Sequence, residues 1–283
     1  MRLGVKAHWR DAPAMVELAL AEGATLLEVH LAPKDLFEDR PRVLETFRPL
    51  RDRLALVVHA PEFVHPPGVP QPILVNLASP VTATRLAAVR MVEATTDLAR
   101  ELGAEAVVIH PGGATRPGEA PQGSLPALRL SLRTLDLRAP CYLENMPAHY
   151  HFRDAGEGTS ALGRFPGDFE GLGGFVDGFC LDVCHAALAR PEGSPQVAEA
   201  FADLLGHQIR HVHVSGARVP AGEGIPPGAP GDVLTPRVLK RVAALVHPEA
   251  AWVPEVWAGE ADAGKGFRFA LRYLREHLPE VFP

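Results

Sequence analysis

RHVHVS, at residues 210–215, places two histidines at alternate positions of a short β-rich run. Successive side chains of a strand point to opposite faces, so His211 and His213 share one face. The runs FCLDVCH (179–185) and WVPEVW (252–257) lie before and after it in the chain, and each carries a carboxylate near its end. These segments predict β-strands whose polar residues lie near one end.

Five further runs of the same kind bring the predicted strands to eight. They are RLGVK (2–6), TLLEVHL (25–31), ALVVHA (55–60), AVVIHP (106–111) and CYLENM (141–146). Between the runs lie apolar stretches with a helical period, clearest at 14–23, 85–103 and 267–278. Strands that alternate with helices indicate βαβ units and a parallel sheet, and eight such strands close a barrel. We therefore predict an α/β fold, a single (β/α)8 TIM barrel whose one domain spans residues 1–283.

The composition is that of an ordinary globular protein. The chain has 283 residues, of which 47% are hydrophobic and 22% charged, and its three cysteines are too few for a disulfide framework. We expect a cytoplasmic protein without a membrane partner, because no run approaches the roughly 20 apolar residues of a membrane span and no apolar leader opens the chain. The formal net charge of -6 counts against a nucleic-acid partner, which usually meets a basic face. The oligomeric state stays open.

Ionisable residues stand at or near the ends of all eight predicted strands. The set, read with a period of two, is Lys6, Glu28, His30, His59, His110, Glu144, Asp182, His213 and Glu255. In a barrel, inward side chains at this end converge on one mouth. Burying so many unpaired ionisable groups is costly, and a cation would offset that cost. We expect a divalent metal ion, with Zn or Mn the best match, held mainly by Glu144, Asp182, His213 and Glu255.

Simpler interpretations stand beside the metal site. Lys6 and Glu28 lie on neighbouring predicted strands and could form only a buried ion pair. His211 would point inward one layer deeper than His213, where it belongs to the core or supports a ligand. The four main residues could also form a charge network without metal, or a structural centre in a barrel that is not an enzyme.

At these strands the sequence resembles the xylose isomerase-like TIM-barrel superfamily. That superfamily includes sugar phosphate isomerases and epimerases, and AP endonucleases of the endonuclease IV type (AP endonuclease family 2). The resemblance covers nearly the whole chain, and its most specific motifs are VVHAPE (57–62), VIHPGG (108–113), YLENMP (142–147), CLDVCHA (180–186), HVHVSG (211–216) and PEVW (254–257).

The isomerase and epimerase branch implies one metal held by Glu144, Asp182, His213 and Glu255. There the glutamates Glu144 and Glu255 are also catalytic, and they move a proton next to the carbonyl of a small, polyhydroxylated, sugar-like substrate. Three further residues of this sequence would hold that substrate: His185, which is also a candidate catalytic residue, Arg218 and Trp257. The resemblance calls for no organic cofactor.

The endonuclease IV branch implies more than one metal. His59 and His110 would bind one ion, with Glu144 bridging to a second. A third ion would need His185 and a DxH motif after the seventh strand, but the loop at 216–236 has no DxH and only one aspartate, Asp232. The sequence therefore favours a metal-dependent isomerase or epimerase with one or two ions. The alternative is a di-metal phosphoesterase or other hydrolase with an incomplete third site.

Overall fold

Eight parallel strands close into a barrel in the order β1-β15-β12-β11-β8-β6-β3-β2. The structure, a computed structural model, describes residues 1–50, 52–64, 73–152 and 156–283. The barrel strands are β1 Arg2–His8, β2 Leu26–His30, β3 Ala55–His59, β6 Ala106–Ile109, β8 Cys141–Glu144, β11 Gly178–Asp182, β12 Ile209–Val214 and β15 Ala251–Pro254. Each matches one of the eight predicted runs, so the predicted (β/α)8 TIM barrel is confirmed.

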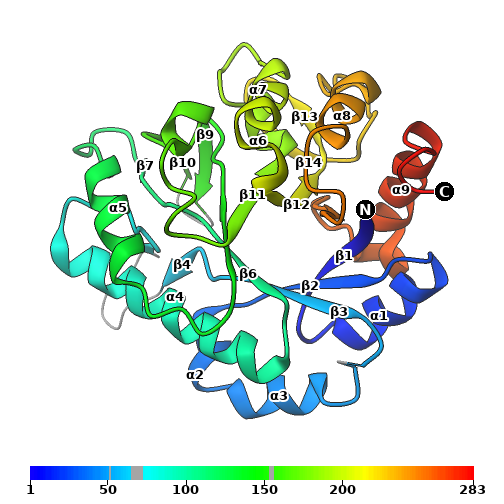
Figure 1. Cartoon of the computed structure of the whole chain (residues 1–283), viewed down its shortest axis with the longest axis horizontal. Coiled ribbons are helices and arrows are strands. Elements are labelled where there is room, and N and C mark those ends of the chain that lie inside the picture. The colour runs from blue at the N-terminus through cyan, green and yellow to red at the C-terminus, as the bar shows by residue number, and fades with distance from the viewer. Residues whose placement is uncertain (51, 65–72, 153–155) are drawn as a thin grey trace.

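Helices surround the strands (Figure 1). Their bounds are α1 Ala12–Ala21, α2 Pro33–Phe37, α3 Arg40–Phe47, α4 Thr82–Leu102, α5 Leu125–Thr134, α6 Val183–Ala187, α7 Gln196–Leu205, α8 Pro236–Ala243 and α9 Ala261–His277, with 3-10 turns η1 Pro166–Phe169 and η2 Gly206–Gln208. Helix α4 ends at Gly103, whose φ of 72° lies in the left-handed region that glycine adopts without strain. None of the described helices is long and apolar enough to cross a lipid bilayer.

The barrel interior changes from apolar to polar along the strands. An apolar layer fills its lower part, formed by Leu26, Val57, Val108, Cys180, Ala251 and Val253. Two residues further along the same strand faces stand His59 on β3 and Asp182 on β11. Burying an aliphatic side chain of this kind contributes about 1.5–3 kcal/mol, so the apolar layer supports a polar layer that is unfavourable by itself.

The loops at the mouth are rich in Pro and Gly, yet they contain three small sheets. The short strands are β4 Phe63–Val64 with β5 Ile73–Leu74, β7 Ala114–Thr115 with β10 Gly156–Ser160 and β9 His149–Phe152, and β13 Gly216–Arg218 with β14 Gly222–Ile225. Residues 65–72 of the loop at 61–72 lie outside the described residues.

Candidate metal centre

Four residues at the barrel mouth bring together oxygen and nitrogen atoms that suit a metal ion. Glu144, Asp182, His213 and Glu255 each offer one such atom, and these atoms all lie within 4.8 Å of one another. Nδ1 of His213 lies 3.1 Å from Oε1 of Glu144 and 2.8 Å from Oε2 of Glu255. The first three residues are buried, while the Glu255 side chain is 26% exposed toward the mouth. The structure thus brings together the four residues that the sequence predicted as metal ligands.

A second cluster shares Glu144. Its carboxylate oxygen Oε2 lies 3.3 Å from Nε2 of His59 and 3.1 Å from Nε2 of His110. His59 donates its Nδ1–H to the carbonyl of Ala60 at 3.0 Å, which turns the lone pair of Nε2 toward Glu144. Glu144 therefore faces one cluster with each oxygen, an arrangement that suits a carboxylate bridging two ions.

The charges in the first cluster fit a divalent cation. Burial would raise the pKa of Glu144, but the imidazoles of His213 and His110 outweigh it and hold that pKa well below its usual value. For Asp182 the balance is the reverse. Burial raises its pKa, His185 lowers it, and the carboxylates of Glu144 and Glu255 raise it further, so the net shift is upward. A cation among these groups would stabilise the ionised form of Asp182. Three carboxylates and an imidazole match Zn or Mn in donor chemistry.

The position of Asp182 also sets that of His185. The run FCLDVCH was predicted as a strand, but the strand ends at Asp182 and residues 183–185 begin α6. The reason is a helix cap: Oδ1 of Asp182 accepts a hydrogen bond from the backbone N of His185 at 2.7 Å. The His185 ring then donates from Nδ1 to the carbonyl of Asn145 at 2.9 Å. Its Nε2 faces Oε2 of Glu223, 3.6 Å away.

His185 should give the metal-free protein a pH-dependent stability. Burial lowers the pKa of its imidazole, but Asp182, Glu223 and Glu144 outweigh burial and raise the pKa to about 9. The unfolded value is about 6.5, so this stabilisation is complete below that pH and disappears as the pH rises through about 9. We expect the free energy of unfolding to fall over this interval by up to about 3 kcal/mol more in the wild type than in His185→Gln.

Urea unfolding of the metal-free proteins at a series of pH values measures this difference. His207→Gln is the matched control, since His207 is exposed on η2 at the far end of the barrel strands. An equal decline in wild type and His185→Gln would show that His185 does not carry the charge in the folded protein.

Two carboxylates near the site were given no role from the sequence. Glu62 accepts a hydrogen bond from the hydroxyl of Tyr150 at 2.5 Å. Burial would raise the pKa of Glu62, but His110 and His59 outweigh it and lower that pKa. Glu223 lies beside His185, and burial raises its pKa to about 7. Two sequence features could have pointed to these residues. Glu62 ends the motif VVHAPE, and Glu223 is a carboxylate between two glycines.

The other predicted substrate residues lie further out. Arg218 is exposed and donates from Nη2 to the carbonyl of Pro230 at 2.8 Å; within the described ranges no hydrogen bond or ion pair joins it to either cluster. Trp257 is 57% exposed and packs on Gly224, where a Cβ atom would lie 2.2 Å from the indole. A glycine at that position is therefore what lets Trp257 lie against the hairpin that carries Glu223.

Asp232, the single aspartate of this loop, has a structural role. Its carboxylate accepts hydrogen bonds from the backbone nitrogens of Ala217, Gly228 and Leu234 at 2.7–2.9 Å. With both oxygens committed to the loop backbone, Asp232 does not supply the ligand that the missing DxH motif would provide.

Comparison with known proteins places this barrel in a family. The family model for the xylose isomerase-like TIM barrel matches residues 16–277. The chain belongs to this family. A Mycobacterium ulcerans relative named "Probable endonuclease 4" is 30% identical over 207 residues, which make up 73% of this chain and 74% of that protein.

Solved structures of other proteins share the fold of this xylose isomerase-like barrel. A D-tagatose 3-epimerase-like protein superposes with a TM-score of 0.70 at 23% identity, covering 100% of this chain and 98% of the other. Endonuclease IV from Thermus thermophilus superposes with a TM-score of 0.65 at 23% identity, covering 99% and 100%. At these identities the likeness shows a shared architecture, and the choice of reaction depends on the site.

Proposed function

We propose that this protein is a metal-dependent isomerase or epimerase that moves a proton next to the carbonyl group of a small polyhydroxylated substrate. One observation carries the proposal: two glutamates, Glu144 and Glu255, both contact Nδ1 of His213, and Asp182 completes the cluster. This cluster offers both a metal site and two carboxylates that can exchange protons. Neither part requires the missing DxH motif.

The two glutamates differ in how they can act. A divalent ion held by the four residues would polarise the substrate oxygens and so acidify the neighbouring C–H group. Burial would raise the pKa of Glu255, but Lys6, 2.6 Å away, and His213 hold it well below its usual value. Glu255 is therefore an ionised carboxylate open to the mouth, so its place in the cluster allows it to receive the substrate proton. Isomerisation can use this group alone, while epimerisation needs a second group, for which Glu144 is the candidate.

His185 is suited to position the substrate. Its Nδ1 is fixed on the Asn145 carbonyl, so its Nε2 is the nitrogen that can meet a substrate oxygen. Glu223 of the hairpin β13–β14 faces His185, and the exposed Trp257 packs on that hairpin. Their role would be to limit the size of the substrate, which suits a sugar-like molecule.

Hydrogen exchange into the substrate tests the proposed chemistry. The zinc- or manganese-loaded protein, incubated with ketoses and keto acids in D2O, should place deuterium on the carbon next to the carbonyl. We expect Glu255→Gln to slow this exchange by about 10²- to 10⁴-fold, the usual contribution of a positioned acid–base group. NMR of the substrate measures both rates.

Glu249→Gln is the matched control for this experiment. It makes the same chemical change at an exposed residue just before β15, at the opposite end of the strand that leads to Glu255. The control should exchange like the wild type. Undiminished exchange in Glu255→Gln, or no exchange by the loaded wild type on any of these substrates, would contradict the proposal.

A two-metal hydrolase acting on a phosphoester is the second candidate. The observation that favours it is the cluster of His59, His110 and Glu144, because a one-metal isomerase has no need of the two histidines. The mycobacterial relative is named as an endonuclease, so the expectation against a nucleic-acid partner is not supported. Cleavage of a duplex with an abasic site, with a rate that falls steeply as salt rises, would establish this activity. Its absence with zinc and with manganese would exclude abasic DNA as the substrate.

A further inference from the structure

A buried carboxylate lies beneath the metal centre and contacts two histidines of the opposite barrel wall. Oε2 of Glu28, on β2, lies 2.6 Å from Nε2 of His211 and 2.8 Å from Nε2 of His213, both on β12. All three side chains are 0% exposed. Oε1 of Glu28 lies 3.1 Å from the ammonium of Lys6. This is more than the simple ion pair of Lys6 and Glu28 that the sequence allowed.

These contacts determine which nitrogen of His213 is available to a metal. An ionised carboxylate only accepts hydrogen bonds, so the contact with Glu28 requires a proton on Nε2 of His213, and the neutral ring that binds a metal then has its lone pair on Nδ1. The ammonium of Lys6, 3.1 Å from Oε1, balances the negative charge of this carboxylate. The other nitrogen, Nδ1, is the one that faces Glu144 and Glu255.

We propose that Glu28 is a positioning residue that orients the His213 ring and fixes its proton on Nε2, so that Nδ1 is presented to the metal. This inference rests on the metal centre of the proposed function. Hydrogen-bonded partners of this kind orient a ligating imidazole and increase its basicity. Glu28 contacts His213 and Lys6 but not the carboxylates of Glu144, Asp182 and Glu255 among the contacts of the described residues, so it acts on the metal through its neighbours.

Lys6 connects this positioning carboxylate to a metal ligand. Its ammonium lies 3.1 Å from Oε1 of Glu28 and 2.6 Å from Oε1 of Glu255. One buried cation thus holds both carboxylates in place, one beneath the metal centre and one within it. Removing the charge of Glu28 should therefore lower the affinity for the metal in two ways, through His213 and through Lys6 with Glu255.

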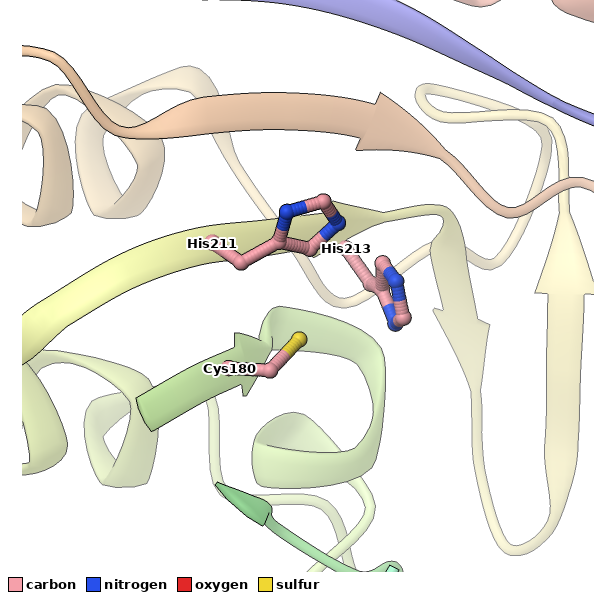
Figure 2. A group of neighbouring side chains, drawn as sticks. All are labelled: Cys180, His211 and His213. Atoms are coloured by element: carbon pink, nitrogen blue, oxygen red, sulfur yellow. The ribbon is translucent and has the colours of Figure 1, made fainter. Parts of the chain in front are cut away.

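The same layer contains a rival arrangement. Cys180 on β11 offers its sulfur within 4.8 Å of ligand atoms of His211 and His213, a set that could bind a thiophilic ion. Figure 2 shows the thiol beside the two rings. The Nε2 atoms of both histidines are already engaged by Glu28. These contacts favour the positioning role over a second metal site.

Zinc affinity and histidine NMR together test the proposal. We expect Glu28→Gln to bind zinc about 10- to 100-fold more weakly than the wild type in competition with a chelating dye, as for other partners of metal ligands. Cys180→Ser, the matched control in the same layer, should bind zinc like the wild type. Circular dichroism checks that both variants fold.

The wild type itself provides a measurement that does not depend on a variant folding. With ¹⁵N-labelled histidine, the zinc-loaded protein should show the His213 proton on Nε2 and the metal shift on Nδ1. A proton on Nδ1, or wild-type affinity in Glu28→Gln, would overturn the proposal. Loss of zinc in Cys180→Ser would assign the ion to the thiol cluster instead. A wild type that bound no zinc would refute this proposal and the metal centre together, whereas zinc binding without hydrogen exchange would refute only the proposed reaction.

Discussion

Replacing Glu144 by alanine should remove all bound metal and all turnover together. Its two oxygens face different clusters, Oε2 toward His59 and His110 and Oε1 toward His213, so either ion would lose a ligand. Removing one partner from a buried charged network also lowers the free energy of unfolding of the metal-free protein, by about 3–5 kcal/mol. Elemental analysis of the purified protein and urea unfolding measure the two effects.

Two further variants make this result interpretable. Glu144→Gln keeps the shape of the side chain and one acceptor oxygen, so it should fold better than the alanine variant while still losing metal and turnover. Glu105→Ala removes a carboxylate from an exposed ion pair with Arg2 and should change the free energy of unfolding by no more than about 1 kcal/mol. Full metal content in both Glu144 variants would show that Glu144 is not a ligand, and the metal would have to be sought elsewhere in the barrel.

Much of this arrangement was accessible from local sequence patterns. Val57 and His59 are two residues apart, as are Cys180 and Asp182, and in each pair the apolar residue lies in the barrel core and the polar one at the mouth. A period of two therefore predicts both the strand and the layer to which each residue belongs. Eight such strands fix the barrel, and the barrel brings their ends together although they are scattered along the chain.

Contacts across the barrel could not be predicted in this way. His211 and Glu28 are 183 positions apart, and their contact depends on the diameter of the closed barrel and on side-chain conformation. The position of Glu223 depends on the hairpin β13–β14, which a Pro- and Gly-rich loop did not indicate. For His185 the deciding feature was the cap from Asp182, which ended the predicted strand three residues early.

Because Glu144 is shared by two clusters, the number of bound ions has to be measured with variants of other residues. Glu144 belongs to the four-residue cluster with Asp182 and to the three-residue cluster with His59. Each cluster also has candidate ligands that the other lacks. Substituting a residue that belongs to only one cluster can therefore remove one ion without the other, which substituting Glu144 cannot do.

His59→Ala and Asp182→Ala should separate the two clusters. If both clusters bind metal, each variant should lose one equivalent and keep one. Of the two clusters, His59 belongs only to the one with His110, and Asp182 belongs only to the one with His213 and Glu255. The proposed isomerase reaction uses the cluster of Asp182, His213 and Glu255, so we expect Asp182→Ala to abolish hydrogen exchange and His59→Ala to retain most of it. Metal content and exchange rate are measured on the same preparations.

His30→Ala is the control for this comparison, since His30 is paired with His59 in the register of β2 and β3 but belongs to neither cluster. It should keep the metal content and exchange rate of the wild type. A protein that holds one equivalent, keeps it in His59→Ala and loses it in Asp182→Ala has a one-metal isomerase centre. Two equivalents, with phosphoester cleavage that disappears in His59→Ala, would instead transfer the assignment to the hydrolase, since water activation at the cluster of His59 and His110 would then be essential.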